Sequence, residues 1–574
     1  MRVHWVTAAL LIVEGSWLAT QEPTSTRRDN IPIYGEATTS LTLSPLGRGW
    51  FASAASKPGE GLNPRSKTPH PRPRLREIAA SPQRGEAGAG WFSLMPSRIV
   101  AKPSGGLRFE VTIDPKQVGD RPPSGRVLVG IAKKGMRPDF TNYKPPVLPI
   151  LGADAEAFTA DKTIVLDDAS DHFPSGPLND LPAGEYSVQA VFLTNPDINL
   201  PDAPGNRFSE PMLVKLDPAA GTTVRLALNA AHEETIPKET ATHKYLKIPS
   251  KLLSDFYGRP VGYRVGVVLP PNFAKEPNKQ YALLVDIGGF GTRYFHAQEM
   301  LPDPRFVQIV PDGAGPLGDP YQVNSANNGP YGDALIQEVI PYIEKSYRCL
   351  GTPKARFTCG ISTGGWVSLA LQIFYPDFFN GCWSQCPDSV TFERFELIDL
   401  YKDANAFVNS YGFERPSTRT DDGDVISTVR HELSLERVLG RGGRWELSGR
   451  DWCCWNAVFG PRGQDGRPVP VWNGKTGAID KGVAEQWRKY DLKLVLEQNW
   501  KSLGPKLAGG KIHIWVGESD DYFLNAAVHR LKNAAAKFKN PRFDGEITIE
   551  LGKPHDYGGW TRSQMLDAMA KRLK

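Results

Sequence analysis

Short runs of apolar and β-branched residues, separated by Pro and Gly, fill the chain between about residue 96 and residue 245. The runs LRFEVTI (107–113), RVLVGIA (126–132) and TTVRLAL (222–228) alternate or cluster these residues as strands do. No run with a convincing helical period lies between them. The pattern therefore predicts a small antiparallel β-sandwich over residues 96–245.

After residue 245 the pattern changes, and apolar strands alternate with helical stretches. The candidate strands are RVGVVLP (264–270), ALLVDI (282–287), FVQIV (306–310), RFTCGI (356–361), KIHIWV (511–516) and EITIEL (546–551). The helical stretches are expected at about 333–347, 364–375, 522–538 and 561–573. Such alternation predicts βαβ units, so residues 246–574 are expected to form an α/β domain with a largely parallel sheet.

One segment of this domain, residues 395–505, breaks the alternation. It lies between a strand expected near 380–385 and the strand at 511, and it is rich in Trp and in loop-forming residues. We expect it to be an insert that forms a lid beside the carboxyl edge of the sheet, where open α/β sheets bind ligands. Trp452 and Trp455 are candidate substrate-binding residues there, although such tryptophans also suit a small core of the insert itself.

The first 95 residues have a different composition. Residues 1–20 contain Arg2 and then an apolar run from residue 5 to 13, which resembles a secretory signal peptide interrupted by Glu14. A periplasmic or secreted protein is therefore expected, and a cytoplasmic one if the natural start lies further on. Residues 21–95 are rich in Pro, Gly, Ser, Ala and Arg, which predicts disorder.

The charge of the chain does not favour a nucleic-acid partner. The net charge is +5, but residues 1–95 alone hold eleven Lys and Arg against seven Asp and Glu. The remaining residues are almost neutral and offer no basic face for a phosphate backbone. No other apolar run approaches the roughly 20 residues of a membrane span, so none is expected.

The six cysteines do not suggest a metal site. Cys382 and Cys386 are four residues apart, Cys453 and Cys454 are adjacent, and no histidine accompanies them at zinc-ligand spacing. We expect buried apolar thiols, with one disulfide as the alternative after export. The glycines match no phosphate loop or dinucleotide fingerprint, so no cofactor is expected either.

The candidate nucleophile is Ser362, in the sequence Gly360-Ile361-Ser362-Thr363-Gly364. This pattern directly follows the apolar strand RFTCGI and opens a helix, which is the context of a nucleophile elbow. The elbow needs small residues at both Gly positions because the serine backbone is strained. A plain strand-to-helix turn is the alternative.

A serine hydroxyl needs a histidine to take its proton and a carboxylate to orient that histidine. Asp520 and Asp521, in GESDDYFL after the strand at 511–516, are both candidates for the carboxylate. His555 follows the last strand, in LGKPHDYGGW. The order Ser, Asp, His along the chain is that of α/β hydrolases.

The oxyanion of an acyl-transfer reaction needs backbone N–H donors. Thr363, the residue after the nucleophile, is expected to supply one donor. Phe290 is expected to supply the other from the glycine-rich loop DIGGFG (286–291), which follows an early strand. A glycine turn with no catalytic duty is the alternative for this loop.

The stretch from about 262 to 390, with GDALIQEVIPYIEKSYR and RFTCGISTGGWVSLAL, resembles the putative-esterase family of α/β hydrolases. That family includes esterase D, S-formylglutathione hydrolases, feruloyl and acetylxylan esterases, and mycolyltransferases. The resemblance implies an α/β-hydrolase fold and selects Asp520, three residues after its glycine, over Asp521. The chain departs from the family where the usual His-Gly reads Gly288-Gly289, and in its long insert.

These observations together predict a serine esterase that cleaves a carboxylic ester through an acyl-enzyme, with a small-molecule or carbohydrate-linked substrate. A serine peptidase of the prolyl-oligopeptidase type is one alternative, but its β domain is normally a propeller of about 300 residues or more. A non-catalytic carbohydrate-binding protein is another. An intact Ser362, Asp520 and His555 set favours the enzyme.

Overall fold

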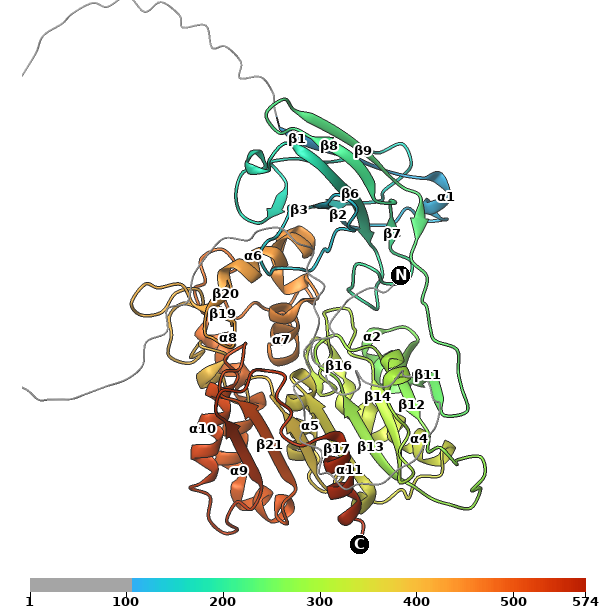
Figure 1. Ribbon diagram of the computed structural model, residues 1–574, viewed down its shortest axis with the longest axis vertical. Helices are drawn as coiled ribbons and strands as arrows, with labels where there is room; N and C mark the ends of the chain where they lie inside the picture. Colours follow the sequence, from blue (N-terminus) through green and yellow to red (C-terminus); the bar gives the residue numbers. More distant parts are fainter. Residues whose placement is uncertain (1–105) are drawn as a thin grey trace, which may run out of the picture. The chain divides into compact units, whose positions relative to one another are not determined.

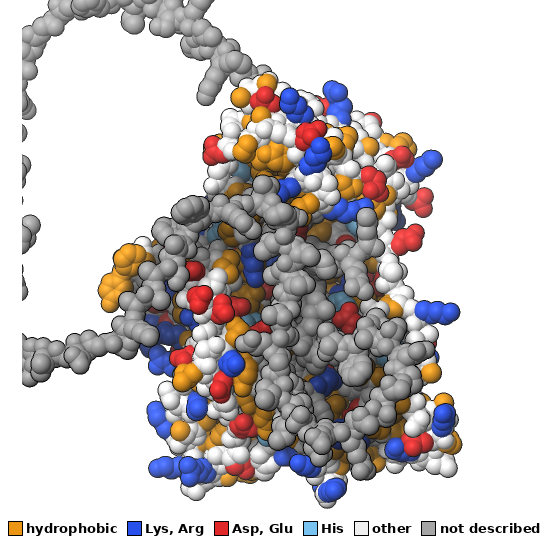
Figure 2. Space-filling model, viewed as in Figure 1, with side chains coloured by type: hydrophobic (Ala, Val, Ile, Leu, Met, Phe, Trp, Pro, Cys, Tyr) orange, Lys and Arg blue, Asp and Glu red, His pale blue; other side chains and the backbone are white. Residues whose placement is uncertain are grey.

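The computed structural model describes residues 106–574 (Figure 1). The signal peptide and the disordered segment predicted for residues 1–95 lie outside the described residues. None of the described helices combines the length and the apolar character needed to cross a membrane. On the face shown in Figure 2, the described basic and acidic side chains are interspersed.

Two sheets form the N-terminal part of the described chain. The first has the order β4 (Ile164–Leu166), β1 (Leu107–Ile113), β9 (Thr222–Leu228). The second has the order β10 (Ala230–Ala231), β7 (Arg207–Phe208), β6 (Gly184–Leu193), β2 (Gly125–Lys133), β3 (Ile150–Ala155), β5 (Asp171–Phe173), with β8 (Met212–Leu216) pairing with β6. Phe109 and Val224 of the first sheet share a buried core with Val129 and Phe192 of the second.

The prediction that these strands are all antiparallel is wrong for one pair. β1 runs parallel to β9, with Leu107 opposite Thr222 and Ile113 opposite Leu228. A parallel pair needs a long crossover, and the strands of the second sheet supply it because they lie between β1 and β9 along the chain. Local alternation of apolar residues indicates a strand but not its direction.

An eight-stranded sheet forms the centre of the C-terminal part. Its order is β11 (His243–Ser250), β12 (Val261–Val268), β14 (Phe306–Pro311), β13 (Ala282–Ile287), β17 (Arg356–Ile361), β18 (Cys382–Gln385), β21 (Ile512–Gly517), β22 (Glu546–Glu550). The strands from β14 to β22 in this order are parallel to one another. β12 runs antiparallel to both of its neighbours, β11 and β14. The α/β-hydrolase fold is thus confirmed. β11 was not predicted, and it begins before residue 246.

Helices cover both faces of this sheet (Figure 1). Leu283 and Val285 of β13 pack in the same core as helix α5 (Thr363–Phe374), whereas Ala282 and Leu284 face the other side and pack against helix α11 (Arg562–Lys571). Alternate residues of a strand point to opposite faces, so a strand buried on both faces reads as one apolar run.

Among the remaining helices of this part, one matches its prediction, one predicted helix is divided, and one was not predicted. Helix α10 (Asn525–Ala535) lies within the predicted range 522–538. The helix predicted at 333–347 is divided into α3 (Tyr331–Ala334), the π-helical segment η3 (Leu335–Val339) and α4 (Ile340–Ser346). The short helix α2 (Lys251–Tyr257), between β11 and β12, was not predicted.

The insert at 395–505 keeps long irregular stretches but also contains helices and strands that were not predicted. The segment contains β19 (Pro416–Arg419), β20 (Val425–Thr428), α6 (Val429–Leu439), α7 (Asp451–Phe459), α8 (Lys481–Gln486) and α9 (Leu492–Leu507). Helix α7, of sequence DWCCWNAVF, is buried from Trp452 to Phe459, so it lacks the polar face by which a helix is recognised. Helix α9 packs against α5 and therefore belongs to the covering layer of the sheet.

The tryptophans of the insert form much of its core. The rings of Trp452 and Trp472 lie edge to face, with centroids 5.4 Å apart, and Trp445 stacks on Trp472 at 5.5 Å. Phe395 contacts Trp452, Trp455 and Trp472. Aromatic edge-to-face pairs of this kind stabilise a core beyond the area that they bury.

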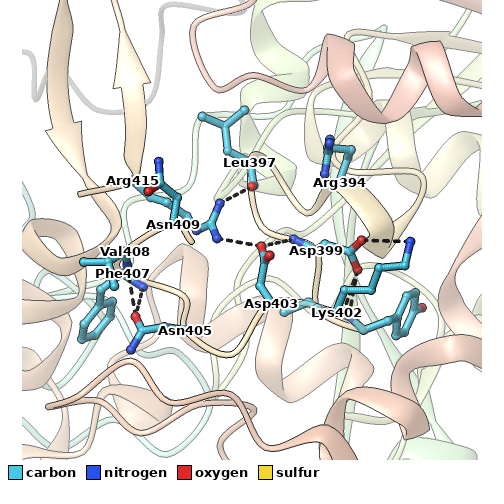
Figure 3. Close-up of polar contacts among 12 residues, drawn as sticks. Arg394, Leu397, Asp399, Lys402, Asp403, Asn405, Phe407, Val408, Asn409 and Arg415 are labelled. Atoms are coloured by element: carbon cyan, nitrogen blue, oxygen red, sulfur yellow. Dashed lines mark hydrogen bonds and ion pairs between the residues drawn. The ribbon is translucent and has the colours of Figure 1, made fainter. Parts of the chain in front are cut away.

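A polar network fixes the first turns of the insert (Figure 3). The buried Arg415 donates from Nη1 to the carbonyl of Leu397 at 2.7 Å and from Nη2 to Oδ2 of Asp403 at 2.7 Å. The same carboxylate oxygen accepts the main-chain N–H of Asp399 at 2.9 Å. Charged hydrogen bonds between residues 397–403 and Arg415 therefore hold this loop in one conformation.

The six cysteines, all within the described range, are buried free thiols.

Candidate active site

Ser362 occupies the tight turn between β17 and α5. Its backbone has φ 58° and ψ −122°, a conformation that L-residues rarely adopt. A Cβ atom on Gly360 would lie 2.4 Å from the carbonyl oxygen of Ile287, and one on Gly364 would lie 1.9 Å from it. Only glycine fits at these two positions, as expected for a nucleophile elbow.

Asp520 and His555 form a buried pair at the ends of β21 and β22. The Nδ1 atom of His555 lies 2.8 Å from Oδ2 of Asp520. The other oxygen of Asp520 accepts the main-chain N–H groups of Tyr522 and Leu524 at 3.0 and 3.1 Å. Of the two carboxyls that the sequence offered, Asp520 therefore makes the hydrogen bond to the imidazole.

Opposing effects act on the imidazole of His555. Burial acts to lower its pKa, but the attraction of Asp520, the hydrogen bond to it, and the charges of Asp388 and Asp521 act in the other direction. The net result is a pKa above the ordinary 6.5. A raised pKa makes the neutral imidazole a stronger base.

The hydroxyl of Ser362 points to a residue that the sequence did not suggest. Its Oγ donates to Oδ1 of Asp388 at 3.4 Å, and within residues 106–574 no hydrogen bond joins it to His555. The main-chain N–H of Asp388 in turn donates to the carbonyl of Ser362 at 3.2 Å. The structure thus brings Asp520 to His555 but places Ser362 against Asp388.

The Asp388 carboxylate is buried among hydrogen-bond donors. Its Oδ2 atom accepts from Thr363 Oγ1 at 3.1 Å, from Trp455 Nε1 at 3.2 Å and from Tyr321 Oη in a short hydrogen bond. Burial raises the pKa of Asp388, and the hydrogen bonds from Tyr321, Trp455 and Thr363 oppose that rise. The backbone of Tyr321, like that of Ser362, has a positive φ, 59°.

The loop predicted to hold the oxyanion lies against the start of α5. A Cβ atom on Gly364 would come within 2.6 Å of the carbonyl oxygen of Gly288, and Thr292 N–H donates to the Gly289 carbonyl at 3.0 Å. Thr363 is the first residue of α5, so its N–H has no partner within the helix. Phe290 is partly buried, with the Arg450 guanidinium 5.3 Å from its ring centroid.

Asp319 ties this loop to Tyr321. Its Oδ1 accepts the main-chain N–H of Tyr321 at 2.9 Å. Burial raises the pKa of Asp319 to about 7, against hydrogen bonds from the backbones of Tyr321 and Gly291. No sequence motif indicated Asp319.

Two residues of the insert, Trp455 and Arg419, donate hydrogen bonds to the site. Trp455 of α7 donates to Asp388, and Arg419 of β19 donates to the carbonyls of Asp520 at 3.0 Å and Glu518 at 3.2 Å. Trp452 points elsewhere, because its Nε1 donates to Glu432 at 3.0 Å and its ring is buried in the aromatic core. Of the two predicted substrate-binding tryptophans, Trp455 is the one beside the candidate nucleophile.

Two further side chains lie near the imidazole. The ring of Tyr522 meets the His555 ring edge to face at 4.8 Å, and Lys144 Nζ lies 5.9 Å from the Tyr522 ring centroid. Lys144 belongs to the loop between β2 and β3, and no sequence motif marked it.

Cys386 is the residue beside the pair that could add a metal ligand. One ligand atom each of Cys386, Asp520 and His555 lies within 4.8 Å of the others. Asp520 and His555 are bonded to each other, however, and the Cys386 thiol donates to the carbonyl of Tyr557 at 3.0 Å. All three side chains are therefore engaged in hydrogen bonds within the protein.

The position of Asp388 in the chain offers one signal that could have found it. It stands in CPDSV, immediately after β18, at the carboxyl end of a central parallel strand. Ligand-binding residues gather at that edge of open α/β sheets. Tyr321 has no comparable signal, because it lies in a long irregular segment after β14.

A family model described as "Putative esterase" matches residues 262–560, just over half of the chain, and this range includes Ser362, Asp388, Asp520 and His555. A comparison with curated protein sequences found no match.

Solved structures also match the chain, at low sequence identity and low TM-scores. One is an S-formylglutathione hydrolase from Agrobacterium tumefaciens, with 13% identity over 59% of this chain and 99% of that chain, and a TM-score of 0.34. A ferulic acid esterase from Anaeromyces mucronatus has 13% identity over 56% and 89%, with a TM-score of 0.26. Dipeptidyl peptidase 4 from Porphyromonas gingivalis has 12% identity over 74% and 46%, with a TM-score of 0.32.

Proposed function

Because the chain belongs to the putative-esterase family, we propose that it hydrolyses carboxylic esters through an acyl-enzyme formed on Ser362. One observation carries this proposal. Ser362 stands in a strained strand-to-helix turn, and a buried Asp520–His555 pair, 2.8 Å apart, follows two strands of the same parallel sheet. Such a set of nucleophile, base and orienting acid suits acyl transfer.

Acylation begins with a rotation of the Ser362 hydroxyl from Asp388 toward Nε2 of His555. As Oγ attacks the ester carbonyl, His555 takes its proton, and Asp520 stabilises the imidazolium through Nδ1. The tetrahedral intermediate then expels the alcohol, which takes the proton back from His555. The raised pKa of His555 supports its role as the base.

The negative charge of the tetrahedral intermediate needs donors already in place. The Thr363 N–H, at the start of α5, also benefits from the positive end of the helix dipole. The N–H of Phe290 is the proposed second donor, because its loop lies against Gly364 and is fixed through Asp319. Neither donor has to reorganise when the charge develops.

The insert is the proposed wall of the substrate site. Trp455 and Arg419 connect it to the nucleophile side and to the acid loop, respectively. A small-molecule or carbohydrate-linked ester is the proposed substrate class, with its acyl or alcohol part against this wall.

Labelling with a fluorophosphonate probe tests the proposal directly. We expect wild-type protein to be modified at Ser362 and Ser362→Ala to lose both the label and the hydrolysis of nitrophenyl esters, since losing such a nucleophile costs on the order of 10⁶ in turnover. Ser389→Ala is the matched control, because within residues 106–574 the Ser389 Oγ accepts only the Glu396 N–H, at 2.8 Å.

Substantial hydrolysis by pure Ser362→Ala, or labelling of another residue, would contradict the assignment. Faster cleavage of peptidyl amides than of any ester would favour the peptidase alternative. No labelling and no turnover would favour a binding protein.

A further inference from the structure

Asp388 contacts the proposed nucleophile, Ser362, but has no role in the proposed acylation step. A buried carboxylate is costly and is kept where it has a partner or a role. Its two oxygens differ in this structure. Oδ2 is saturated by Tyr321, Thr363 and Trp455, whereas within residues 106–574 Oδ1 receives only the Ser362 hydroxyl from a side chain.

Acylation removes that one donor. Once the acyl group is attached to Ser362, Oγ carries no hydrogen and cannot donate to Oδ1. The carboxylate stays in place, because its Oδ2 partners and the hydrogen bond from its own main chain to Ser362 are unaffected. An acceptor therefore becomes vacant 3.4 Å from the oxygen of the ester bond that water must next cleave.

On the basis of the proposed acyl-enzyme, we propose that Asp388 is a catalytic residue of deacylation, whose Oδ1 holds and orients the hydrolytic water. The water donates one hydrogen to Asp388 Oδ1 and the other to Nε2 of His555. Two acceptors fix the direction of its lone pair toward the acyl carbonyl, and positioning of this kind is a large part of catalysis.

The deacylation step then balances without another reactant. The water oxygen bonds to the acyl carbon, and His555 takes one proton from the water. The tetrahedral intermediate expels Ser362 Oγ, which receives that proton from the imidazolium. The product is the carboxylic acid, Asp388 remains ionised throughout, and the Ser362 hydroxyl again donates to Oδ1.

The charges around Asp388 agree with this role. Asp388 and His555 attract one another, which favours the imidazolium that forms as water is deprotonated. Burial disfavours the ionised form of Asp388, and the hydrogen bonds from Tyr321, Trp455 and Thr363 to Oδ2 offset this effect. Oδ1 of Asp388 can thus accept a hydrogen bond from water because the donors to Oδ2 hold the carboxylate in place.

The Asp388→Asn variant changes the critical atom with almost no change in shape. Three donors converge on the Oδ2 position, so the amide oxygen must occupy that position to accept from them. The amide NH₂ then faces Ser362 Oγ, where it can donate but cannot accept a hydrogen from water. The substitution therefore exchanges an acceptor for a donor at the proposed water site.

Rapid-mixing kinetics with a nitrophenyl ester separate the two half-reactions, because nitrophenol is released on acylation. For Asp388→Asn we expect a burst of nearly one nitrophenol per site, a burst rate within about tenfold of wild type, and deacylation slowed by about 10²-fold. Mass spectrometry of the quenched variant should find the acyl group on Ser362. Tyr321→Phe is the matched control: it removes one donor to Oδ2 but leaves Oδ1, so it should not shift the ratio of the two rates.

Equal slowing of both half-reactions in Asp388→Asn would overturn the proposal, as would an unchanged deacylation rate. Failure of wild-type Ser362 to be acylated at all would instead overturn the proposed function. Asp388→Ser extends the test if the Asn variant does not fold. It lacks the carboxylate and should also slow deacylation more than acylation, but less severely, because its hydroxyl can still accept from water; the opposite order of effects would again overturn the proposal.

Discussion

The imidazole of His555 is hydrogen-bonded to Asp520 at 2.8 Å, although Asp521 is the next residue and also carries a carboxyl near the ring. An acid that fixes the imidazole tautomer is worth about 10⁴ in turnover. We therefore expect Asp520→Asn to lower kcat for nitrophenyl esters by about that factor. Asp521→Asn, the matched control, should lower it by less than about tenfold, since it leaves the hydrogen bond in place.

If Asp521→Asn were the more damaging change, the pairing of His555 with Asp520 would not be the catalytic one. Thermal unfolding of both variants distinguishes lost chemistry from lost structure.

The pH dependence of kcat/KM should report the titration of His555. The base must be neutral, so kcat/KM rises with pH through the pKa of the imidazole, which lies above 6.5. The charges facing this ring are the carboxylates of Asp520, Asp388 and Asp521, with Tyr522 and the Cys386 thiol as uncharged neighbours. We expect Asp388→Asn to move the midpoint toward lower pH, because it removes one negative charge. An unmoved midpoint in a folded variant would show that Asp388 does not act on His555.

Trp455 and Trp452 offer a matched pair, since each is buried in α7 and each donates from Nε1 to a carboxylate. Trp455→Phe removes a donor from Asp388, so we expect kcat to fall by about fivefold to tenfold, equivalent to about one hydrogen bond. Trp452→Phe removes a donor from the buried Glu432, so the free energy of unfolding should fall by about 1–3 kcal/mol with turnover retained. Denaturant unfolding and steady-state kinetics measure the two effects.

A panel of esters with increasing acyl length tests the role of the insert in the same variants. A changed preference order in Trp455→Phe alone would support the insert as the substrate wall beside α7. A changed order in Trp452→Phe would place that ring in the substrate site, contrary to its burial in the aromatic core.

Gly364→Ala should strongly lower the stability of the protein. Its Cβ would lie 1.9 Å from the carbonyl oxygen of Ile287, a backbone atom at the end of β13 that cannot rotate away. We expect a loss of about 3 kcal/mol or more in the free energy of unfolding. Gly176→Ala is the control, because its nearest neighbour would be 4.0 Å away. A stable, active Gly364→Ala protein would show that the elbow is wider than the structure has it.

The inner strands of the central sheet could be predicted from the sequence because they are buried on both faces and read as continuous apolar runs, whereas the partly exposed edge strand β11 was not predicted. ALLVDI and RFTCGI match β13 and β17 residue for residue. The positions of Ser362, Asp520 and His555 followed from those strands, because each stands in a loop just beyond a carboxyl end. Chain order and strand ends are local information, and local information was enough here.

Asp388, Tyr321 and the helices of the insert could not be predicted in this way. The Asp388 carboxylate accepts hydrogen bonds from Tyr321 and Trp455, each of which is 67 residues away along the chain, one before it and one after it. Helix α7 lost its periodic signal because neighbours surround it completely, and the parallel pairing of β1 with β9 depends on a crossover through another sheet. Each of these features is set by tertiary packing rather than by the local pattern.

The hydrogen bond from Trp455 to Asp388 also limits how the insert can move. Lifting α7 away from the sheet would break that bond and leave a buried carboxylate short of a donor, and the Arg419 hydrogen bonds to the acid loop would break as well. Opening and closing of α7 and β19 would therefore break the hydrogen bonds to Asp388 and to the Asp520 loop in every catalytic cycle. The hydrogen bonds of Trp455 and Arg419 therefore favour an insert that stays in place while substrate enters and product leaves.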